Sequence, residues 1–193
     1  MSKEVFEEIK KISGLLNKNK LGIFPCKNSY MIIGSSIGSS DKKIRVLKEK
    51  KIVKPLVRVI LDLSEDKKIF DYYRSLPQNK KDLVDVFRYS DLIFASVEKK
   101  IGFTFASNPY ERYLLKLLKN SIYASSANIS GEPTQFSVKK LSSKIKKSSD
   151  FILDVGDLPP RGDFAVLNLD NLTWLREGAS TKTINSYLGK NNL

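Results

Sequence analysis

The chain has 193 residues, 34 of them lysine or arginine and 21 aspartate or glutamate, so its formal net charge is +13 at pH 7. Because it contains no histidine, imidazole bases, Ser-His-Asp triads and histidine-ligated zinc are excluded. Apolar residues make up 41 % of the chain, and no apolar run is long enough to span a bilayer, so we expect a globular protein without a membrane helix.

Hydrophobic periodicity divides the first third of the chain into helices and strands. Apolar residues at helical spacing predict an amphipathic helix over residues 3–18. Asp41 is expected to cap a second helix that continues to about Lys48. Apolar runs, the last rich in β-branched residues, predict strands over residues 21–25, 30–33 and 56–61.

Prolines mark the helices in the rest of the chain: Pro77 separates two of them and Pro109 opens another. We expect helices over 65–75 and 78–89, from 109, from Ser137 and at the C-terminal end, and strands over 91–97, 101–107, 121–125, 151–155, 164–169 and 172–176. This order of elements, with hairpins among them, predicts one α/β domain over residues 1–193. Its twisted, mixed, largely antiparallel sheet is flanked by helices.

A polar loop is expected after the strand at 121–125, where residues 125–134 read SSANISGEPT. The loop presents three serines, one asparagine and one threonine within ten residues. So many short donors and acceptors at the end of a strand suit a polar ligand such as a nucleotide. The alternative is a turn that only caps the following helix.

Two cationic segments are candidates for phosphate binding. Pro55 favours a helix end shortly after Lys48 and Lys50, and at such an end their ammonium groups could converge on one polyphosphate. Arg176 ends an expected strand, where its guanidinium could bind a phosphate or a ring nitrogen. The alternatives are a solvated lysine run and a surface ion pair.

The segment PCKNSY, residues 25–30, places small polar groups between the first two strands. Cys26 is the one cysteine of the sequence, so it forms no internal disulfide and fits a reducing cytoplasm. Without histidine nothing obvious except lysine would activate its thiol, so we do not expect it to be catalytic. The N-terminus lacks the apolar core of a signal peptide, and a cytoplasmic location is expected.

Taken in chain order, these segments resemble the YrdC family, the threonylcarbamoyl-AMP synthases of tRNA modification. The family's Ser/Thr-Ser-Ala-Asn-x-Ser-Gly loop is matched by Ser125, Ser126, Ala127, Asn128, Ser130 and Gly131. Its Lys-x-Arg pair and the Pro-Leu strand that follows are matched by Lys48, Lys50, Pro55 and Leu56, with lysine in place of arginine. A closing stretch is matched by Leu175, Arg176, Gly178 and Ala179, and the resemblance covers roughly residues 20–180.

The resemblance implies a nucleotidyltransferase that joins L-threonine, bicarbonate and ATP, with Mg²⁺ carried on the ATP, to give threonylcarbamoyl-AMP and pyrophosphate. The product feeds the t6A modification of tRNA, so RNA and the proteins that complete t6A are further expected partners; no membrane partner and no tightly bound organic cofactor are expected. The residues implied for ATP are Lys48, Lys50, Ser126, Asn128 and Arg176. Those implied for the threonine and bicarbonate pocket are Pro25, Cys26, Asn28, Tyr30, Thr104 and Ser125. No residue is assigned as an acid or a base, because positioning and charge stabilisation suffice for this reaction.

The chain departs most from the family where the amino acid would bind. Cys26 and Asn28 replace two threonines, and Thr104 replaces an arginine. Losing an arginine that faces a carboxylate should cost about 2–5 kcal/mol unless Lys27 or Lys54 substitutes. Two alternatives therefore stay open: a YrdC-like protein that binds RNA or nucleotide with reduced or lost catalysis, and a related transfer to another amine.

Overall fold

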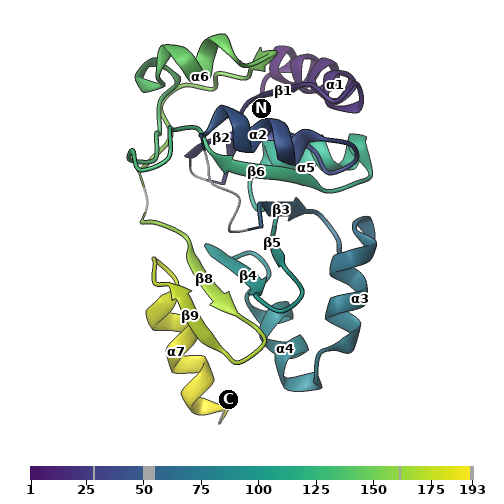
Figure 1. Ribbon diagram of the computed structural model, residues 1–193, viewed down its shortest axis with the longest axis vertical. Helices are drawn as coiled ribbons and strands as arrows, with labels where there is room; N and C mark the ends of the chain where they lie inside the picture. Colours follow the sequence, from purple (N-terminus) through teal and green to yellow (C-terminus); the bar gives the residue numbers. More distant parts are fainter. Residues whose placement is uncertain (28, 50–54, 161, 192–193) are drawn as a thin grey trace.

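The strands form one mixed sheet in a computed structural model that describes residues 1–27, 29–49, 55–160 and 162–191 (Figure 1). Within these residues the strand order is β7-β1-β2-β6-β3-β5-β4-β8-β9. The strands are β1 (Leu21–Cys26), β2 (Ser29–Ser35), β3 (Val57–Ile60), β4 (Leu92–Ser96), β5 (Ile101–Phe105), β6 (Ile122–Ser126), β7 (Phe151–Ile152), β8 (Ala165–Asn168) and β9 (Thr173–Arg176). The β1–β7, β3–β5 and β4–β8 pairs are parallel and the other pairs antiparallel, which confirms the predicted mixed, largely antiparallel sheet.

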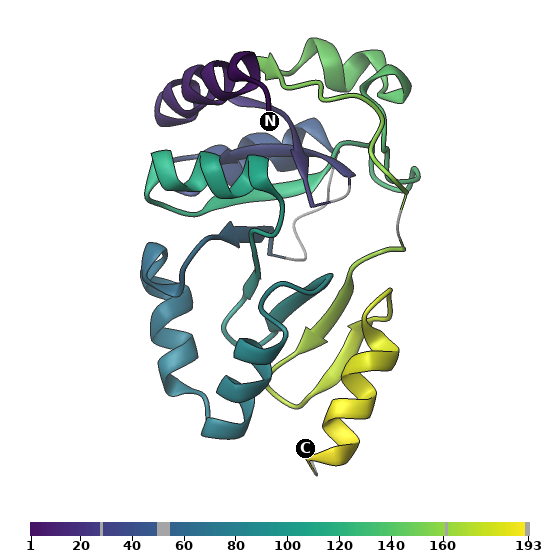
Figure 2. The ribbon, with the colours of Figure 1, turned by 180° about the vertical axis from the view of Figure 1, so that it is seen from behind.

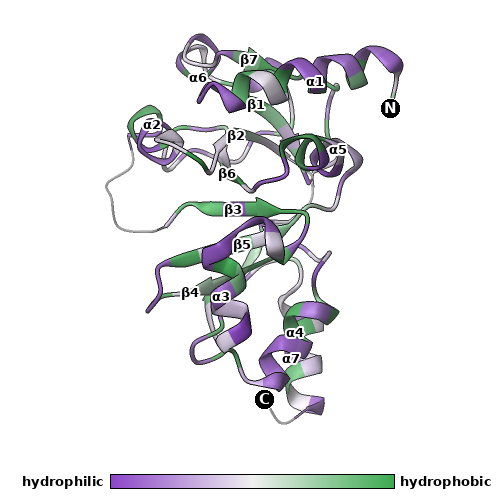
Figure 3. Ribbon diagram, turned by 90° about the vertical axis from the view of Figure 1, so that its right-hand side faces the viewer, coloured by the Kyte–Doolittle hydropathy of each residue, from purple (hydrophilic) through white to green (hydrophobic). Residues whose placement is uncertain are grey.

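Helices cover both faces of the N-terminal part of the sheet. On one face α1 (Lys3–Asn17) packs next to α5 (Pro109–Leu118), as Figure 2 shows, and both bury apolar side chains in one cluster. On the other face α2 (Ser40–Leu47) and α6 (Ser143–Lys147) contribute Ile44 and Ile145 to a second cluster. The view along the sheet in Figure 3 shows the two pairs of helices on opposite sides of largely hydrophobic strands.

The C-terminal part of the sheet has a core of its own. Phe94, Phe103 and Phe105 are fully buried there and pack ring against ring, with centroids 5.4–6.5 Å apart. Three helices share this cluster: α3 (Lys67–Ser75), α4 (Gln78–Val86) and α7 (Thr181–Lys190). Pro77 is the last residue of the linker between α3 and α4 and directly precedes the first residue of α4. The fixed φ of proline suits this position at the start of a helix.

Two of the predicted helices differ in detail from those in the structure. The N-cap position of α2 is occupied by Ser39, so Asp41 lies in the first turn of the helix and does not cap it. The segment from Ser137, predicted as one helix, forms a 3₁₀ turn (Val138–Lys140) followed by α6. The break occurs because the backbone is extended through Leu141 and Ser142, and the Ser142 side chain accepts the Ile145 N–H and so begins a new helix. None of the described helices combines the length and apolar character needed to cross a bilayer.

Candidate functional site

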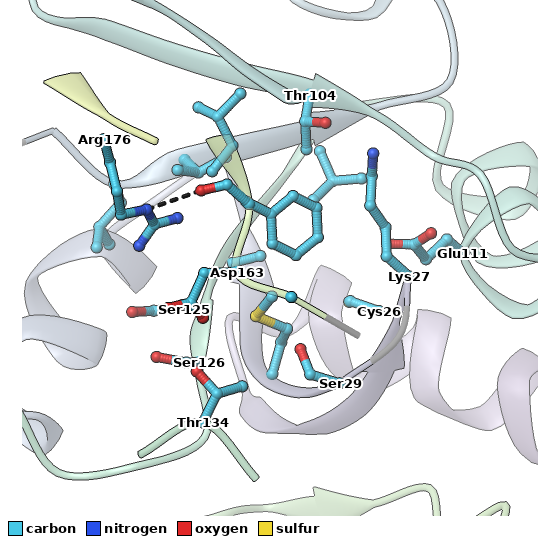
Figure 4. Close-up of a pocket in the computed structure, with 18 of the residues that line it drawn as sticks. Cys26, Lys27, Ser29, Thr104, Glu111, Ser125, Ser126, Thr134, Asp163 and Arg176 are labelled. Carbon is cyan, nitrogen blue, oxygen red and sulfur yellow. Dashed lines mark hydrogen bonds between the residues drawn. The ribbon is translucent and has the colours of Figure 1, made fainter. Parts of the chain in front are cut away.

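A cavity of about 180 Å³ opens on one face of the sheet (Figure 4). Its wall takes residues 29 and 31 from β2 and 57 and 59 from β3, which alternate along their strands and so face the same side, and residues 124, 125 and 126 from the end of β6. The polar part of the wall consists of Cys26, Lys27, Ser29, Thr104, Glu111, Ser125, Ser126, Thr134, Asp163 and Arg176. Segments more than 140 residues apart in sequence thus meet in one wall.

The polar loop after β6 is organised around Lys48. The Lys48 ammonium is buried and donates to the Ser126 carbonyl (2.5 Å), the Ser126 hydroxyl (3.1 Å) and Asn128 Oδ1 (2.8 Å). In return Ser130 Oγ donates to the Lys48 carbonyl at 2.9 Å. The end of α2 and the loop therefore hold each other in place, and of these three loop residues Ser126 lies in the cavity wall.

Arg176 reaches the same cavity from the end of β9, 50 residues after Ser126. Its Nε donates to the Phe164 carbonyl at 2.8 Å, which fixes the plane of the guanidinium while the side chain stays exposed. Figure 4 shows it on the side of the cavity that holds Ser125 and Ser126. Lys50, which the sequence also assigned to ATP, lies outside the described residues, as does Asn28.

The residues predicted for the threonine pocket separate into two groups. Cys26, Thr104 and Ser125 line the cavity, whereas Pro25 and Tyr30 do not belong to its wall. Tyr30 is fully buried; its hydroxyl donates to the Gly156 carbonyl at 2.7 Å and accepts the Val155 N–H at 2.9 Å. Burial raises the pKa of Tyr30 to about 12, so its hydroxyl stays protonated and anchors the chain after β7.

The Cys26 thiol is unsuited to nucleophilic attack. It is buried, and this burial, together with the neighbouring Glu111 carboxylate, holds the pKa of Cys26 well above its ordinary value. Thr104 is engaged as well, because its buried hydroxyl donates to the Leu92 carbonyl at 2.7 Å. Neither side chain offers an activated nucleophile, which agrees with a site that works by positioning its ligands.

Besides Asp163, two ionisable wall residues were not assigned to the pocket from the sequence. Glu111 is fully buried at the start of α5, where its Oε2 accepts the Ser107 and Asn108 N–H groups at 3.2 Å and completes a capping box with Asn108. Lys27 lies in the β1–β2 turn and had been named only as a substitute cation. The Asn-Pro-Tyr-Glu sequence signals the capping box, but no local pattern signals that Glu111 meets the turn at Lys27.

Burial governs the charges of both residues. It raises the pKa of Glu111, an effect opposed by the Asn108 N–H and by Lys27. It lowers the pKa of Lys27, an effect opposed by Glu111 and then by Asp91. Among the described residues no three cysteine, aspartate or glutamate side chains gather into a metal-binding group.

Comparisons with known proteins agree with this architecture. The family model of the Sua5, YciO and YrdC proteins, described as "Telomere recombination", matches residues 14–178. E. coli YciO is 19 % identical with a TM-score of 0.76, and the match covers 90 % of both chains. P. abyssi Sua5 complexed with L-threonine is 21 % identical with a TM-score of 0.74, and the match covers 90 % of this chain.

The match covers 54 % of that Sua5 chain, so this chain spans about half of its length. Full-length HypF in a phosphate- and nucleotide-bound form has a TM-score of 0.66 at 20 % identity, and the match covers 83 % of this chain and 27 % of HypF. At these identities the likeness shows a shared fold. No curated protein matches the sequence.

Proposed function

Because the chain belongs to the Sua5/YciO/YrdC family, we propose that it is an L-threonylcarbamoyladenylate synthase that serves the t6A modification of tRNA. The observation that carries the proposal is the shared cavity. The hydroxyl-rich loop after β6 and Arg176, both suited to a nucleotide, line the same space as Cys26 and Thr104 on the side proposed for the amino acid. The L-threonine complex of a Sua5 with this fold supports the choice of amino acid.

On the nucleotide side, donors from separate elements face one space. We assign the hydroxyls of Ser125, Ser126 and Thr134 to hydrogen bonds with ATP, and the Arg176 guanidinium to its phosphates. We assign the carboxylate of Asp163, which also belongs to the cavity wall, to the Mg²⁺ that ATP carries. Lys48 and Asn128 act by holding the loop that carries Ser126.

The chemistry requires no protein nucleophile. The threonine nitrogen forms a bond to the carbon of CO₂, which bicarbonate supplies with loss of water, and the amine gives up a proton. A carbamate oxygen then forms a bond to the α-phosphorus of ATP as the bond to the leaving pyrophosphate breaks. The protein aligns the reactants and stabilises charge at the phosphates, as Arg176 can.

Pyrophosphate release from ATP and bicarbonate, measured with and without L-threonine, tests the proposal. We expect release to depend on threonine. We also expect Arg176→Ala to raise the KM for ATP, while Arg74→Ala, an exposed arginine of α3 outside the cavity wall, leaves it unchanged. Folded protein that releases no pyrophosphate in response to threonine would rule the proposed activity out.

A second candidate function is RNA binding with reduced or lost catalysis. It is favoured by the net charge of +13 and by exposed lysines that follow the loop: Lys139, Lys140, Lys144 and Lys147. Such a surface binds phosphates electrostatically, so RNA affinity should fall steeply as salt concentration rises. Salt-dependent RNA binding by a protein without threonine-dependent pyrophosphate release would favour this function over the synthase.

A further inference from the structure

Lys27 presents an ammonium group at the cavity wall without a carboxylate in contact. Its Nζ donates to the Ser90 carbonyl at 2.5 Å and lies 5.2 Å from the centre of the Phe164 ring. No aspartate or glutamate of the described residues forms an ion pair with it. One carbonyl uses one of the three N–H donors of the ammonium, so two donors are available to a ligand.

The turn that carries this ammonium is held in place by the start of α5. Lys27 has a left-handed backbone (φ 51°), and its carbonyl accepts a hydrogen bond from Asn108 Nδ2 at 3.3 Å. The same amide donates to the Pro25 carbonyl at 3.0 Å, so the start of α5 holds the whole turn. The backbone of the turn is held at two carbonyls and the ammonium is held by the Ser90 carbonyl, so Lys27 is a positioned cation.

Lys27 also separates the cavity from a wider hollow of about 570 Å³. Its neighbours in that hollow include Tyr89, Ser90, Asp91 and Asn108. Lys27 belongs to the walls of both spaces, and the residue as a whole is half-buried. An anion entering from either space meets the same ammonium.

Other donors near Lys27 are less suitable for a carboxylate. The Thr104 hydroxyl is buried and already donates to the Leu92 carbonyl. Arg176 is the other cation among the described wall residues, and it lies across the cavity on the side of Ser125 and Ser126. The wall therefore has two separated positive groups, which matches a ligand pair with phosphates at one end and a carboxylate at the other.

We infer that Lys27 binds the carboxylate of the amino-acid substrate, while the rest of the amino acid occupies the 180 Å³ cavity. This inference rests on the proposed function and names the residue that makes the amino-acid end of the cavity selective for a ligand with a carboxylate. Lys27 supplies the positive charge from the β1–β2 turn, because Thr104, on the neighbouring wall at β5, is uncharged. Glu111, buried behind the turn, opposes the lowering of the Lys27 pKa that burial causes.

Calorimetric titration of the whole chain, with ATP and Mg²⁺ present and no added bicarbonate, tests the inference. The two ligands are L-threonine and L-threoninol, which carries a hydroxymethyl group in place of the carboxylate. We expect Lys27→Met to weaken L-threonine binding by about tenfold or more. Binding of L-threoninol, already weaker in the wild type, should not change, and in turnover the KM for threonine should rise while that for ATP stays constant.

Lys100→Met is the matched control. Lys100 lies in the β4–β5 turn with a nearly identical left-handed backbone (φ 52°), and it is exposed and outside both cavity walls. This variant should bind L-threonine as the wild type does. If Lys27→Met fails to fold, the comparison of the two ligands on the wild type still decides: equal affinity for L-threonine and L-threoninol would overturn the inference.

The outcomes separate the inference from the proposed function. Wild-type protein that binds L-threonine, together with a folded Lys27→Met variant that binds it equally well, would overturn the inference alone. Wild-type protein that does not bind L-threonine would overturn both.

Discussion

Lys48 shows how a residue at a binding site can act through its neighbours. The residue is only 3 % exposed, and its ammonium donates to the carbonyl and hydroxyl of Ser126 and to the amide oxygen of Asn128. The lysine thereby gives the loop one conformation in which Ser126 faces the cavity. Preorganising the loop in this way reduces the entropy that nucleotide binding would otherwise cost.

Replacing Lys48 by methionine should therefore affect stability and nucleotide binding together. The variant removes the charged donor that the Ser126 carbonyl and Asn128 Oδ1 share and leaves them only the Asn128 N–H and the Ser126 hydroxyl, so we expect the free energy of unfolding to fall by about 1–3 kcal/mol. Urea unfolding measures this change, and ATP titration should show weaker binding. Lys42→Met, on an exposed position of α2, is the control, and an equal loss in both variants would contradict the role of Lys48.

Cys26 should be inert while the protein is folded. Because burial, reinforced by Glu111, raises the pKa of Cys26, the thiolate that reacts with iodoacetamide is scarce at mildly alkaline pH. We expect alkylation to proceed no faster than unfolding and to become fast in urea. Mass spectrometry follows the modification, and rapid labelling of the native protein would contradict the structure at this residue.

At the scale of elements, the start of α5 joins a helix cap to the β1–β2 turn. Asn108 Oδ1 accepts the Glu111 N–H at 2.8 Å, and its Nδ2 holds the carbonyls of Pro25 and Lys27. The cap stabilises the helix, and the amide donors place Lys27 against the cavity. Two substitutions can separate these contributions.

Asn108→Ala removes both interactions, and we expect it to lower the free energy of unfolding by about 0.5–2 kcal/mol through the lost cap. Asn108→Ser keeps an oxygen that can cap the helix but has no amide donors for the turn. Both variants should weaken L-threonine binding, while the serine variant loses less stability. Full threonine affinity in a folded serine variant would show that the amide does not position Lys27.

Glu111 should make stability depend on pH. Burial raises its folded pKa above the ordinary value of 4.5, so the native state holds the proton more tightly than the unfolded chain does. Stability from this group is therefore fully present below pH 4.5 and falls as pH rises toward the folded pKa. Glu111→Gln keeps a capping side chain and stays neutral.

Urea unfolding of wild type and Glu111→Gln over a series of pH values tests this expectation. The wild type should lose stability relative to the variant as pH rises above 4.5, and the difference should level off below it. Glu98→Gln, an exposed site in the β4–β5 turn, should follow the wild type. A relative gain of wild-type stability with rising pH would contradict the assignment.

Most elements could be predicted from the sequence because their signals are local. Pro109 and the apolar stripe after it mark α5, and the alternating or continuous apolar runs mark the strands. The predicted helix from Ser137 was wrong in its continuity. Val138, Leu141 and Ile145 keep helical spacing, but Ser142 caps a second helix and local hydrogen bonding outweighs periodicity there.

At the scale of the whole molecule, the sheet brings together groups that are distant in the chain. The order β1-β2-β6-β3-β5 places the turn at Lys27, the loop after Ser126 and Thr104 around one cavity, and β8 with β9 closes it through Arg176. Family resemblance could point to the motifs at Ser126 and Arg176. It could not assign Glu111, because that contact depends on how α5 meets the β1–β2 turn.

The central claim is that this cavity joins threonine, bicarbonate and ATP in one reaction. Mass spectrometry of the products formed with ¹³C-bicarbonate tests it most directly. The account predicts threonylcarbamoyl-AMP that carries the ¹³C label and appears only when L-threonine, ATP and Mg²⁺ are all present. Folded protein that binds ATP and L-threonine but forms no labelled adduct would contradict it.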